Sequence, residues 1–484
     1  MSNVSIKKNF IYNAILTVSN YIFPLLTFPY VTRVLGVEHL GIYNFVESSI
    51  QYFITLSLLG INATAIREIV RTRSNRQVLS ETFSSLLLMV LCSTLLSLAI
   101  LFVCIQLIPK FYVYKDLFYI GAVKILFSAL LVEWLYSGLE NFRYITIRSI
   151  IVKLVYVLCV FLFVQDTDDY ALYFLLTVLL TVGNAILNLI YSRKFLTITF
   201  RNIDFRPYIS SFLVLGIYQI CTSLYNAFNI LYLGIVSDEI QVGYYSVAVR
   251  LYTIILALFT AFTGVMIPRK TALLTEGRMT EFLDITYKSV DVLLAFIVPT
   301  IVVTVFYAPE IIRLIAGPGY EGSVVLMRML MPLMFIIGYE QIIITQTLLP
   351  IKKDRAILIN SILGGSVALL LNYLLVSHLQ SVGSAIVWIV CELVVLCSGQ
   401  YFVKKYINLN FPYIKVLKRI LVVIPLFSVL YYYGRLADNI LVNIMYGSVF
   451  VFSYYLVLEF YIFHNSLLKS SLRSFKIWEK LKSR

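Results

Sequence analysis

The chain contains few of the side chains on which soluble enzymes depend. Only 13% of its 484 residues are charged, and it has three histidines. So little polar surface cannot cover a soluble globule of this length. The histidines, His39, His378 and His464, lie too far apart in the sequence to suggest a zinc site or a catalytic triad. We therefore predict no catalytic group, no metal and no cofactor.

Other motifs of soluble proteins are also missing. No CxxC pair and no phosphate-binding GxxxxGK loop occurs in the sequence. This argues against a disulfide framework, a metal knuckle and a built-in ATPase motor. The six cysteines all fall inside apolar stretches: Cys92, Cys104, Cys159, Cys221, Cys391 and Cys397.

Apolar residues are abundant instead. They make up 60% of the chain, and the mean hydropathy is +0.89. A bilayer core of about 30 Å requires roughly 20 apolar residues per helical crossing, and we count fourteen such stretches. The first, near 10–34, continues without a small-residue cleavage site and reads as a retained span. The sequence predicts an all-α polytopic membrane protein with about 14 transmembrane helices.

Positive charges alternate between the connections of these spans. With the N-terminus taken as inside, 31 lysines and arginines fall on the inner side and five on the outer side. The positive-inside rule then places both termini in the cytoplasm and the protein in the bacterial inner membrane. The net charge of +14 is spread over many connections, which favours topology signals over a nucleic-acid site. We expect no nucleic acid as a partner.

A weak internal repeat suggests two halves. Two turns about 200 residues, or six spans, apart share a Leu-Gly pair followed by a glycine and a tyrosine. An even offset gives both copies the same orientation, as in transporters built from parallel repeats. The first copy is Leu35, Gly36, Gly41 and Tyr43, and the second is Leu233, Gly234, Gly243 and Tyr245. The predicted parts are an N-lobe at 1–208, a C-lobe at 209–410, helices 13 and 14 at 411–465, and a basic cytoplasmic tail at 466–484.

Polar residues line one face of the first and seventh spans. Spacings of three and four residues place them on the same side of a helix. Because such groups need partners or water inside a bilayer, we expect both faces to turn toward a cavity. Hydrogen bonding between helices without a role in transport is the alternative. The residues are Asn13, Thr17 and Asn20, and Gln219, Ser223, Asn226 and Asn229.

Basic residues also occur inside the predicted spans. At about 1.5 Å per residue, Lys124 and Arg250 lie roughly 10 to 12 Å below the outer boundary, Arg328 is shallower, and Arg33 ends the first span. Cations that face a wet cavity would bind phosphate or pyrophosphate, and arginine can do so with two parallel hydrogen bonds. Internal salt bridges, for example of Arg250 or Arg328 with Glu47 or Glu392, and snorkelling of Arg33 and Arg328 are the alternatives.

Carboxylates inside the spans are candidates for ion coupling. Glu392 lies near the predicted midplane, and Glu133 and Glu340 lie inward of it. An ionisable group in the bilayer is costly unless it is paired or hydrated, so each of the three is a candidate carrier of a coupling proton or sodium ion. Asp291 and Glu459 lie close to the predicted cytoplasmic boundary, where we expect them to be solvated.

Three short stretches resemble a known family. They are PYVTRVLG followed by GIY at 29–43, VGYYSVAVRL at 242–251, and GPGYEGS continuing to RML at 317–330. Each is similar to sequences of O-antigen and capsular-repeat flippases, which belong to the multidrug/oligosaccharidyl-lipid/polysaccharide exporter superfamily. The likeness extends along essentially the whole chain, including the plan of fourteen spans.

The resemblance implies a transporter and not an enzyme. It implies two pseudo-symmetric six-helix lobes around a central cavity, plus two C-terminal helices. By alternating access they would move an undecaprenyl-pyrophosphate-linked oligosaccharide to the periplasmic leaflet. Arg33 and Arg250 occupy positions that match family motifs, and the resemblance implies a role for them in a cationic cavity. The prediction for Lys124 and Arg328 rests on their depth within the predicted spans. Many relatives carry an acidic residue where this chain has Asn229, which weakens a role of that helix in ion coupling.

The expected partners are this lipid-linked oligosaccharide and the membrane lipids, and contact with the polymerase and export machinery stays open. Three alternatives also remain open at this stage. A lipid II flippase would use the same chemistry on a different sugar. A cation-coupled multidrug antiporter would require a cavity lined by carboxylates. A membrane polymerase or ligase would need a large outer loop, and the longest one here, near 309–322, is about fourteen residues. The choice between O-antigen and capsule is open as well.

Overall fold

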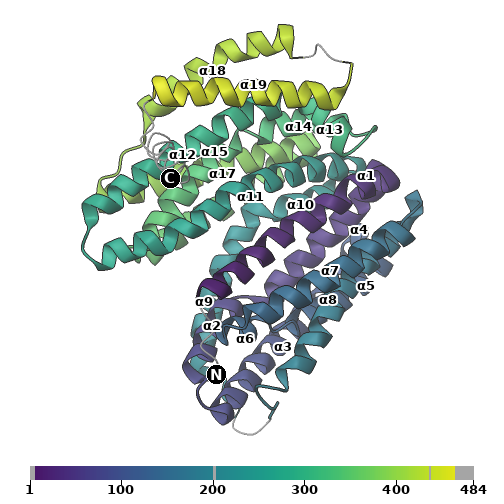
Figure 1. Cartoon of the computed structure of the whole chain (residues 1–484). Helices are drawn as coiled ribbons and strands as arrows, with labels where there is room; N and C mark the ends of the chain where they lie inside the picture. The colour runs from purple at the N-terminus through teal and green to yellow at the C-terminus, as the bar shows by residue number, and fades with distance from the viewer. Residues whose placement is uncertain (1–5, 200–202, 435–437, 464–484) are drawn as a thin grey trace, which may run out of the picture. The chain divides into compact units, whose positions relative to one another are not determined.

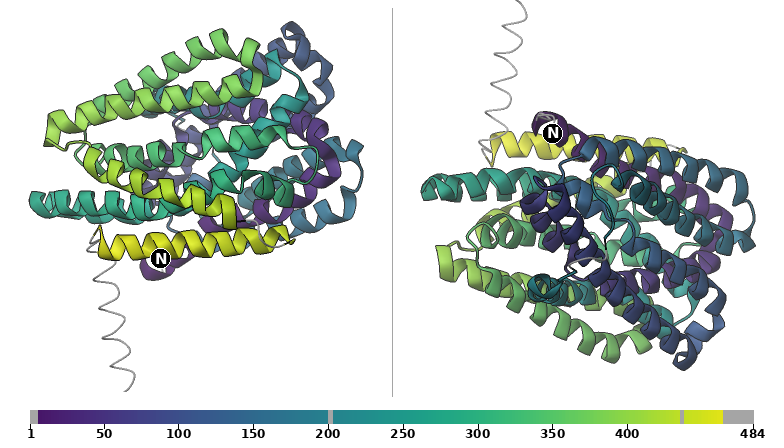
Figure 2. Two further views of the ribbon diagram at one scale, coloured as in Figure 1. Left: turned by 90° about the horizontal axis from the view of Figure 1, so that it is seen from above. Right: turned by 90° about the horizontal axis from the view of Figure 1, so that it is seen from below.

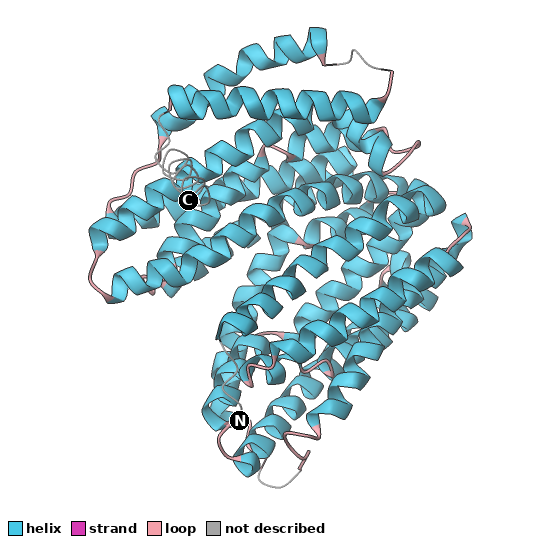
Figure 3. Ribbon diagram, viewed as in Figure 1, coloured by secondary structure: helices cyan, strands magenta, loops and turns pink. Residues whose placement is uncertain are grey.

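The computed structural model describes residues 6–199, 203–434 and 438–463. Every regular element in these ranges is a helix, and no strand occurs in them (Figure 3). The prediction of an all-α membrane protein is confirmed. The predicted basic tail at 466–484 lies outside the described residues.

The chain divides into two compact units, each with its own packing (Figure 1). Unit 1 comprises Met1–Ser246 and Ala368–Ser384, and unit 2 comprises Val247–Val367 and Ala385–Arg484. The units are defined by which residues lie close together in space, whereas the predicted lobes are defined by an internal repeat in the sequence. The lobe boundaries therefore stay a prediction.

Unit 1 consists of the helices up to α10, the start of α11, and a later segment with the end of α16, a short π-helical turn and the start of α17. Its core lies where α2, α3 and α6 meet, around the buried side chains of Phe83, Trp134 and Tyr136. The elements are α1 (Ile6–Leu58), α2 (Ile61–Thr72), α3 (Arg76–Leu107), α4 (Pro109–Val113), α5 (Lys115–Ala129), α6 (Glu133–Gly138), α7 (Phe142–Phe163), η1 (Thr167–Asp169), α8 (Tyr170–Ser192), α9 (Arg206–Asn226), α10 (Phe228–Val236) and η3 (Asn372–Val376).

Local sequence explains where several of these helices begin and break. The Asn75 side chain accepts hydrogen bonds from the backbone amides of Gln77 and Val78 and caps α3. Pro109 stands in the first turn of α4, where a missing N–H costs nothing. Within α1, Gly36 has a φ of 69° and a ψ of 177°, a conformation that only glycine adopts readily, and the helix bends there.

The two turns of the predicted repeat contact each other inside unit 1. A methyl group in place of the Gly41 hydrogen would lie 1.8 Å from the carbonyl oxygen of Glu239. A methyl group on Gly243 would lie 2.3 Å from the carbonyl oxygen of Val37. The matching glycines thus each allow the backbone of the other turn to approach.

Polar groups of α4 and its flank secure the same turn. The Glu239 carboxylate accepts a hydrogen bond of 2.5 Å from the Tyr114 hydroxyl and forms an ion pair of 2.6 Å with Lys110. Burial, reinforced by this carboxylate, raises the pKa of the Tyr114 phenol above its usual value. Tyr114 therefore stays a hydrogen-bond donor at any physiological pH.

Unit 2 contains the remaining helices. Three helices have parts in both units: α11 (Glu239–Thr275) and α17 (Ser377–Ile407) begin in unit 1 and end in unit 2, and the last residues of α16, from Ala368 on, belong to unit 1. The other elements are α12 (Met279–Phe306), α13 (Ala308–Ile315), α14 (Gly322–Leu330), α15 (Leu333–Glu340), η2 (Gln341–Leu348), α16 (Asp354–Leu371), α18 (Tyr413–Tyr433) and α19 (Ile440–Tyr461).

The last two helices both pack against α12, as the yellow-green and yellow segments of Figure 2 illustrate. Their apolar contacts centre on Tyr307, which is fully buried and whose hydroxyl donates a hydrogen bond of 2.8 Å to the Gly434 carbonyl. Gly447 of α19 lies against the same ring, because a methyl group there would meet the Tyr307 hydroxyl at 2.0 Å.

A buried ion network joins the same three helices. The Arg419 guanidinium contacts the Glu459 carboxylate at 2.7 and 3.1 Å, and its side chain and that of Glu459 are 3% and 1% exposed. Asp291 accepts two hydrogen bonds of 2.9 Å from Lys415. The expectation that Glu459 is solvated is wrong, because Arg419 compensates its charge inside the protein.

Eleven helices among the described residues are long and apolar enough to cross a membrane. Two of these runs, Ile11–Thr72 and Asp354–Ile407, have 62 and 54 residues and contain breaks at Gly36 and Gln380. A single crossing requires about 20 residues, so each run is long enough for two. The predicted count of fourteen stays a prediction.

Candidate functional site

Lys124, a predicted substrate-binding cation, lies on α5 in an ion pair. Its Nζ atom is 2.6 and 2.7 Å from the two carboxylate oxygens of Glu47, and the two side chains are 10% and 26% exposed. An internal salt bridge to Glu47, suggested above for Arg250 or Arg328, is thus formed by Lys124.

The three predicted arginines all have exposed side chains. On α1, Arg33 donates a hydrogen bond of 3.4 Å to the Pro29 carbonyl. Arg328 of α14 donates one of 3.2 Å to the Val305 carbonyl. Arg250 lies on α11 in unit 2. Exposed guanidinium groups are accessible to a ligand, but whether the four cations share a cavity stays a prediction.

The predicted polar face of the first span lies on the N-terminal half of α1. Asn13, Thr17 and Asn20 are all exposed, and the Thr17 hydroxyl donates to the Asn13 carbonyl at 2.9 Å. The Asn20 side chain accepts a hydrogen bond from Lys153 of α7, which also donates to Ser19 at 3.0 Å. Part of this face therefore contacts a neighbouring helix.

The second predicted polar face spans α9 and α10. Gln219 is exposed, and the half-buried Ser223 donates to the Ile220 carbonyl at 2.8 Å. The Asn226 side chain lies outside the described residues. Asn229 is fully buried and accepts a hydrogen bond of 2.9 Å from Asn372 of η3. This last contact is the helix-to-helix hydrogen bond expected of polar groups in lipid.

The three predicted carboxylates occupy two different settings. Glu133 of unit 1 is 48% exposed and forms an ion pair of 2.8 Å with Arg148. In unit 2 the buried side chains of Glu340 and Glu392 hydrogen-bond to each other, although 52 residues separate them in the sequence. A hydrogen bond between two carboxyl groups requires a proton on one of them.

Aromatic side chains enclose this carboxyl pair. The Trp388 indole donates a hydrogen bond of 2.9 Å to Glu392. Tyr252 packs edge-on against that indole, with ring centroids 5.1 Å apart, and is buried. Among the described residues its hydroxyl has no hydrogen-bond partner. The pair is thus a buried, acidic site inside unit 2.

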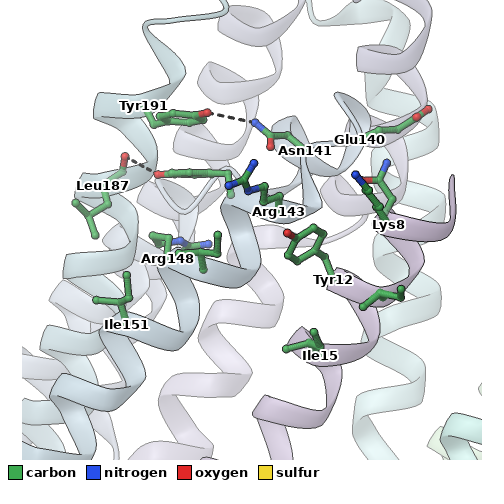
Figure 4. A pocket seen from close by; sticks show the side chains of 14 residues that line it. Lys8, Tyr12, Ile15, Glu140, Asn141, Arg143, Arg148, Ile151, Leu187 and Tyr191 are labelled. Atoms are coloured by element: carbon green, nitrogen blue, oxygen red, sulfur yellow. Dashed lines mark hydrogen bonds between the residues drawn. The ribbon is translucent and has the colours of Figure 1, made fainter. Parts of the chain in front are cut away.

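Unit 1 contains an open groove of about 1270 Å³ between the N-terminal parts of α1 and α7 and the end of α8 (Figure 4). We call it the basic groove. Its polar part contains Lys8, Arg143 and Arg148, together with tyrosine rings. Its apolar part is lined by isoleucines and a leucine: Ile11, Ile15, Ile147, Ile151 and Leu187.

The charges in this groove are only partly compensated. Arg148 is 4% exposed, and its guanidinium contacts Glu133 at 2.8 Å and Asn184 at 2.7 Å. Glu140, the acid of the lining, pairs with Arg73 at 2.8 Å. Lys8 and Arg143 are exposed, and no described carboxylate forms an ion pair with either. The groove therefore carries excess positive charge.

Two contacts between α1 and α7 hold the groove in shape. The Thr146 hydroxyl donates to the Tyr12 carbonyl at 2.9 Å, and Lys153 bonds Ser19 and Asn20 further along. On the opposite side, the Tyr144 and Tyr191 rings stack with centroids 3.8 Å apart. The groove walls are therefore fixed by hydrogen bonds and aromatic packing.

No sequence motif predicts this groove. Arg143, Arg148 and Lys153 count among the inner-side basic residues of the sequence, and α7, which carries all three, begins at Phe142. No side chain caps the start of α7, so no motif marked it. The polar spacing of Asn13 and Asn20 was the one available signal that α1 has a polar partner.

Solved structures with a similar fold are transporters. The chain matches "Lipid II flippase MurJ, inward closed conformation" with a TM-score of 0.75 over 93% of this chain and 99% of that one, at 16% identity. It also matches a multidrug resistance MATE family transporter of the MOP superfamily in an outward-facing conformation, with a TM-score of 0.55 over 84% and 97% of the two chains, at 13% identity. The fold is the one expected from the resemblance.

Curated relatives agree in kind. The chain is 24% identical over 414 residues to a protein of Escherichia coli (strain K12) named "Putative O-antigen transporter", covering 83% of this chain and 98% of the relative. A protein of the same name from Shigella dysenteriae is 23% identical over 396 residues, covering 81% and 98%. These relatives are named as transporters, in agreement with the prediction of a transporter over an enzyme. The model of the family described as "Polysaccharide biosynthesis protein" matches residues 6–273, more than half of the chain, and this multi-pass membrane transporter belongs to that family.

Proposed function

We propose that this protein is a flippase for an undecaprenyl-pyrophosphate-linked oligosaccharide, the repeat unit of an O-antigen or a capsular or exopolysaccharide. The repeat unit would move from the cytoplasmic to the periplasmic leaflet. The observation that carries the proposal is the match to relatives named O-antigen transporters over 98% of their length. Family membership and a flippase-like fold support it.

The physical task is to carry a diphosphate through a low-dielectric layer. A charged group in the bilayer core costs several kcal/mol unless it is compensated. In the proposal, Arg33, Arg250 and Arg328 present guanidinium groups to the diphosphate in a central cavity that opens to each side in turn. Lys124 also binds the diphosphate once its ion pair with Glu47 is broken. The prenyl chain stays in the lipid.

Coupling to a proton or a sodium ion is assigned to the pair formed by Glu340 and Glu392. Two buried carboxyl groups in contact cannot both be ionised without a cation between them, because like charges repel strongly at low dielectric. Glu133 is the weaker candidate, since Arg148 already compensates its charge.

The proposed location is the bacterial inner membrane with both termini in the cytoplasm, as the distribution of lysine and arginine predicts. The proposed partners are the lipid-linked oligosaccharide and the surrounding lipids. Work beside a polymerase and export machinery is a further part of the proposal.

A lipid II flippase is the second candidate, favoured by the fold match to such a protein over 93% of this chain. It would use the same cations on a different sugar. A cation-coupled multidrug antiporter has less support, since three of the predicted cavity residues are exposed arginines.

The test is translocation of a fluorescent undecaprenyl-pyrophosphoryl oligosaccharide in proteoliposomes, with a quencher outside only. Native protein is expected to flip the lipid, and Arg250→Ala is expected to lower the rate by at least about tenfold, the effect of one charge-assisted hydrogen bond. Arg278→Ala is the matched control, because Arg278 is an exposed arginine outside the predicted cavity that pairs with Glu281 and Glu276.

Lipid II and an organic cation serve as competing substrates in the same vesicles. Faster movement of lipid II than of the oligosaccharide lipid would support the second candidate. Export of the organic cation against a proton or sodium gradient, with no lipid movement, would overturn the proposal.

A further inference from the structure

We propose that the basic groove of unit 1 binds the diphosphate end of a prenyl lipid. The inference rests on the proposed function, because it takes the lipid carrier as the substrate. It names a site and residues that the predicted cavity does not include. The polar part would hold the diphosphate, and the apolar part would hold the first isoprene units.

The charge balance favours an anion of more than one charge. Lys8 and Arg143 are exposed in the groove and unpaired with any described carboxylate. Arg148 adds a third cation, and the one acid of the lining, Glu140, is already bonded to Arg73. A diphosphate offers oxygens for several donors at once, which suits guanidinium and ammonium groups together.

The start of α7 adds donors to these cations. Its first turn contains no acidic residue, and no side chain caps its free N–H groups. A helix N-terminus of this kind attracts anions. Arg143 stands in that first turn, where a cation opposes the helix dipole unless an anion lies nearby.

Arg148 is oriented before any ligand arrives. Its nearly buried guanidinium is fixed by Glu133 and Asn184, and its Nε atom has no hydrogen-bond partner among the described residues. A buried N–H without a partner is destabilising, because it has lost its hydrogen bonds to water. A phosphate oxygen in the groove would supply that partner after a small shift of the side chain.

The apolar part of the groove matches a branched hydrocarbon chain. Ile11 and Ile15 of α1 face solvent or lipid with 55% and 43% exposure, and Ile147 and Ile151 of α7 with 44% and 56%. These side chains follow directly on the cations along both helices. A free sugar phosphate or a soluble anion would leave this half of the groove unused, whereas a prenyl diphosphate fills both halves.

The experiment measures binding of farnesyl diphosphate to the full-length protein in nanodiscs made of a zwitterionic lipid, with farnesol and inorganic pyrophosphate as partial ligands. Arg143→Ala and Lys8→Ala are each expected to raise the Kd for farnesyl diphosphate about tenfold, the loss of one charge-assisted contact. Arg143→Lys is expected to recover part of the affinity. Farnesol and pyrophosphate are each expected to bind more weakly than the complete ligand.

Arg148→Met tests the deeper cation, and its folding is checked by thermal unfolding because the side chain is buried. Arg143→Ala and Lys8→Ala change exposed residues and keep the test valid if Arg148→Met does not fold. Arg278→Ala again serves as the control for a change of one positive charge.

Unchanged affinity in both exposed variants would overturn the inference. Equal weakening by Arg278→Ala would do the same, because it would indicate a general charge effect. Displacement of farnesyl diphosphate by an equal mole fraction of phosphatidylglycerol would identify the groove as a site for bulk anionic lipid, which also contradicts it.

The outcomes for the groove and for the function separate cleanly. If the Arg143 and Lys8 variants flip the oligosaccharide lipid as well as native protein does, the proposed function stands and the inference about the basic groove fails. If the protein binds farnesyl diphosphate through these residues but flips no lipid, the inference stands and the proposed function fails.

Discussion

Arginines in the two units stand in opposite electrostatic settings. In unit 2, Arg419 is closed in by Glu459 and Asp291, and Lys415 completes a network of two cations and two carboxylates. In unit 1, the basic groove holds three cations, and Arg148 has the one direct carboxylate partner among them. The same residue type thus joins helices where its charge is matched and offers a ligand site where it is not.

The largest expected effect comes from removing the matched cation. Arg419→Met leaves the buried Glu459 carboxylate without its partner, which costs about 3–5 kcal/mol of unfolding free energy. Thermal unfolding in detergent, followed by circular dichroism, measures the loss. Arg419→Met combined with Glu459→Leu is expected to recover most of it. A single variant as stable as native protein would contradict the structural role of this network.

An intermediate effect is expected at the pair of Lys124 and Glu47, which is less buried. Lys124→Met leaves a carboxylate that is 26% exposed, so a loss of about 1–3 kcal/mol is expected. Lys124→Met with Glu47→Gln is expected to regain stability without regaining lipid flipping, because the ammonium is still missing.

Both readouts, thermal unfolding and flipping in proteoliposomes, are needed for that pair. If the double variant flips lipid at the native rate, Lys124 has a structural role like that of Arg419, and its proposed role in binding the substrate is contradicted.

The smallest effect is expected at Arg278, which lies between α11 and α12 with Glu281 and Glu276 at 2.6 and 2.8 Å. These side chains are exposed, and water solvates their charges almost as well as the ion-pair partners do, so the pairs add little stability. Arg278→Ala is expected to change neither unfolding temperature, farnesyl diphosphate binding nor lipid flipping. A clear change in any of the three would mean that exposure is a poor guide to which cations matter.

Sequence reasoning reached the membrane class and the helical fold because apolar run length and charge asymmetry are local signals. It located Lys124 and Glu47 inside spans but did not pair them, since their contact joins α1 and α5 across 77 positions. The contact of Glu340 with Glu392 was beyond reach for the same reason. Periodicity also could not locate the start of α7, because the Asn141 side chain provides no cap, and so the sequence did not predict that Arg143 lies in a groove.

The reciprocal glycines of unit 1 set a limit on how that part of the chain can move. At Gly41 the three nearest atoms are all backbone atoms of Glu239, and at Gly243 the nearest is the backbone carbonyl oxygen of Val37. A displacement of about one ångström would either bring backbone atoms of the two segments into steric conflict or break their contact, so the contact is either fully formed or lost. Residues 37 to 43 and 239 to 243 therefore form a two-state contact between the two segments.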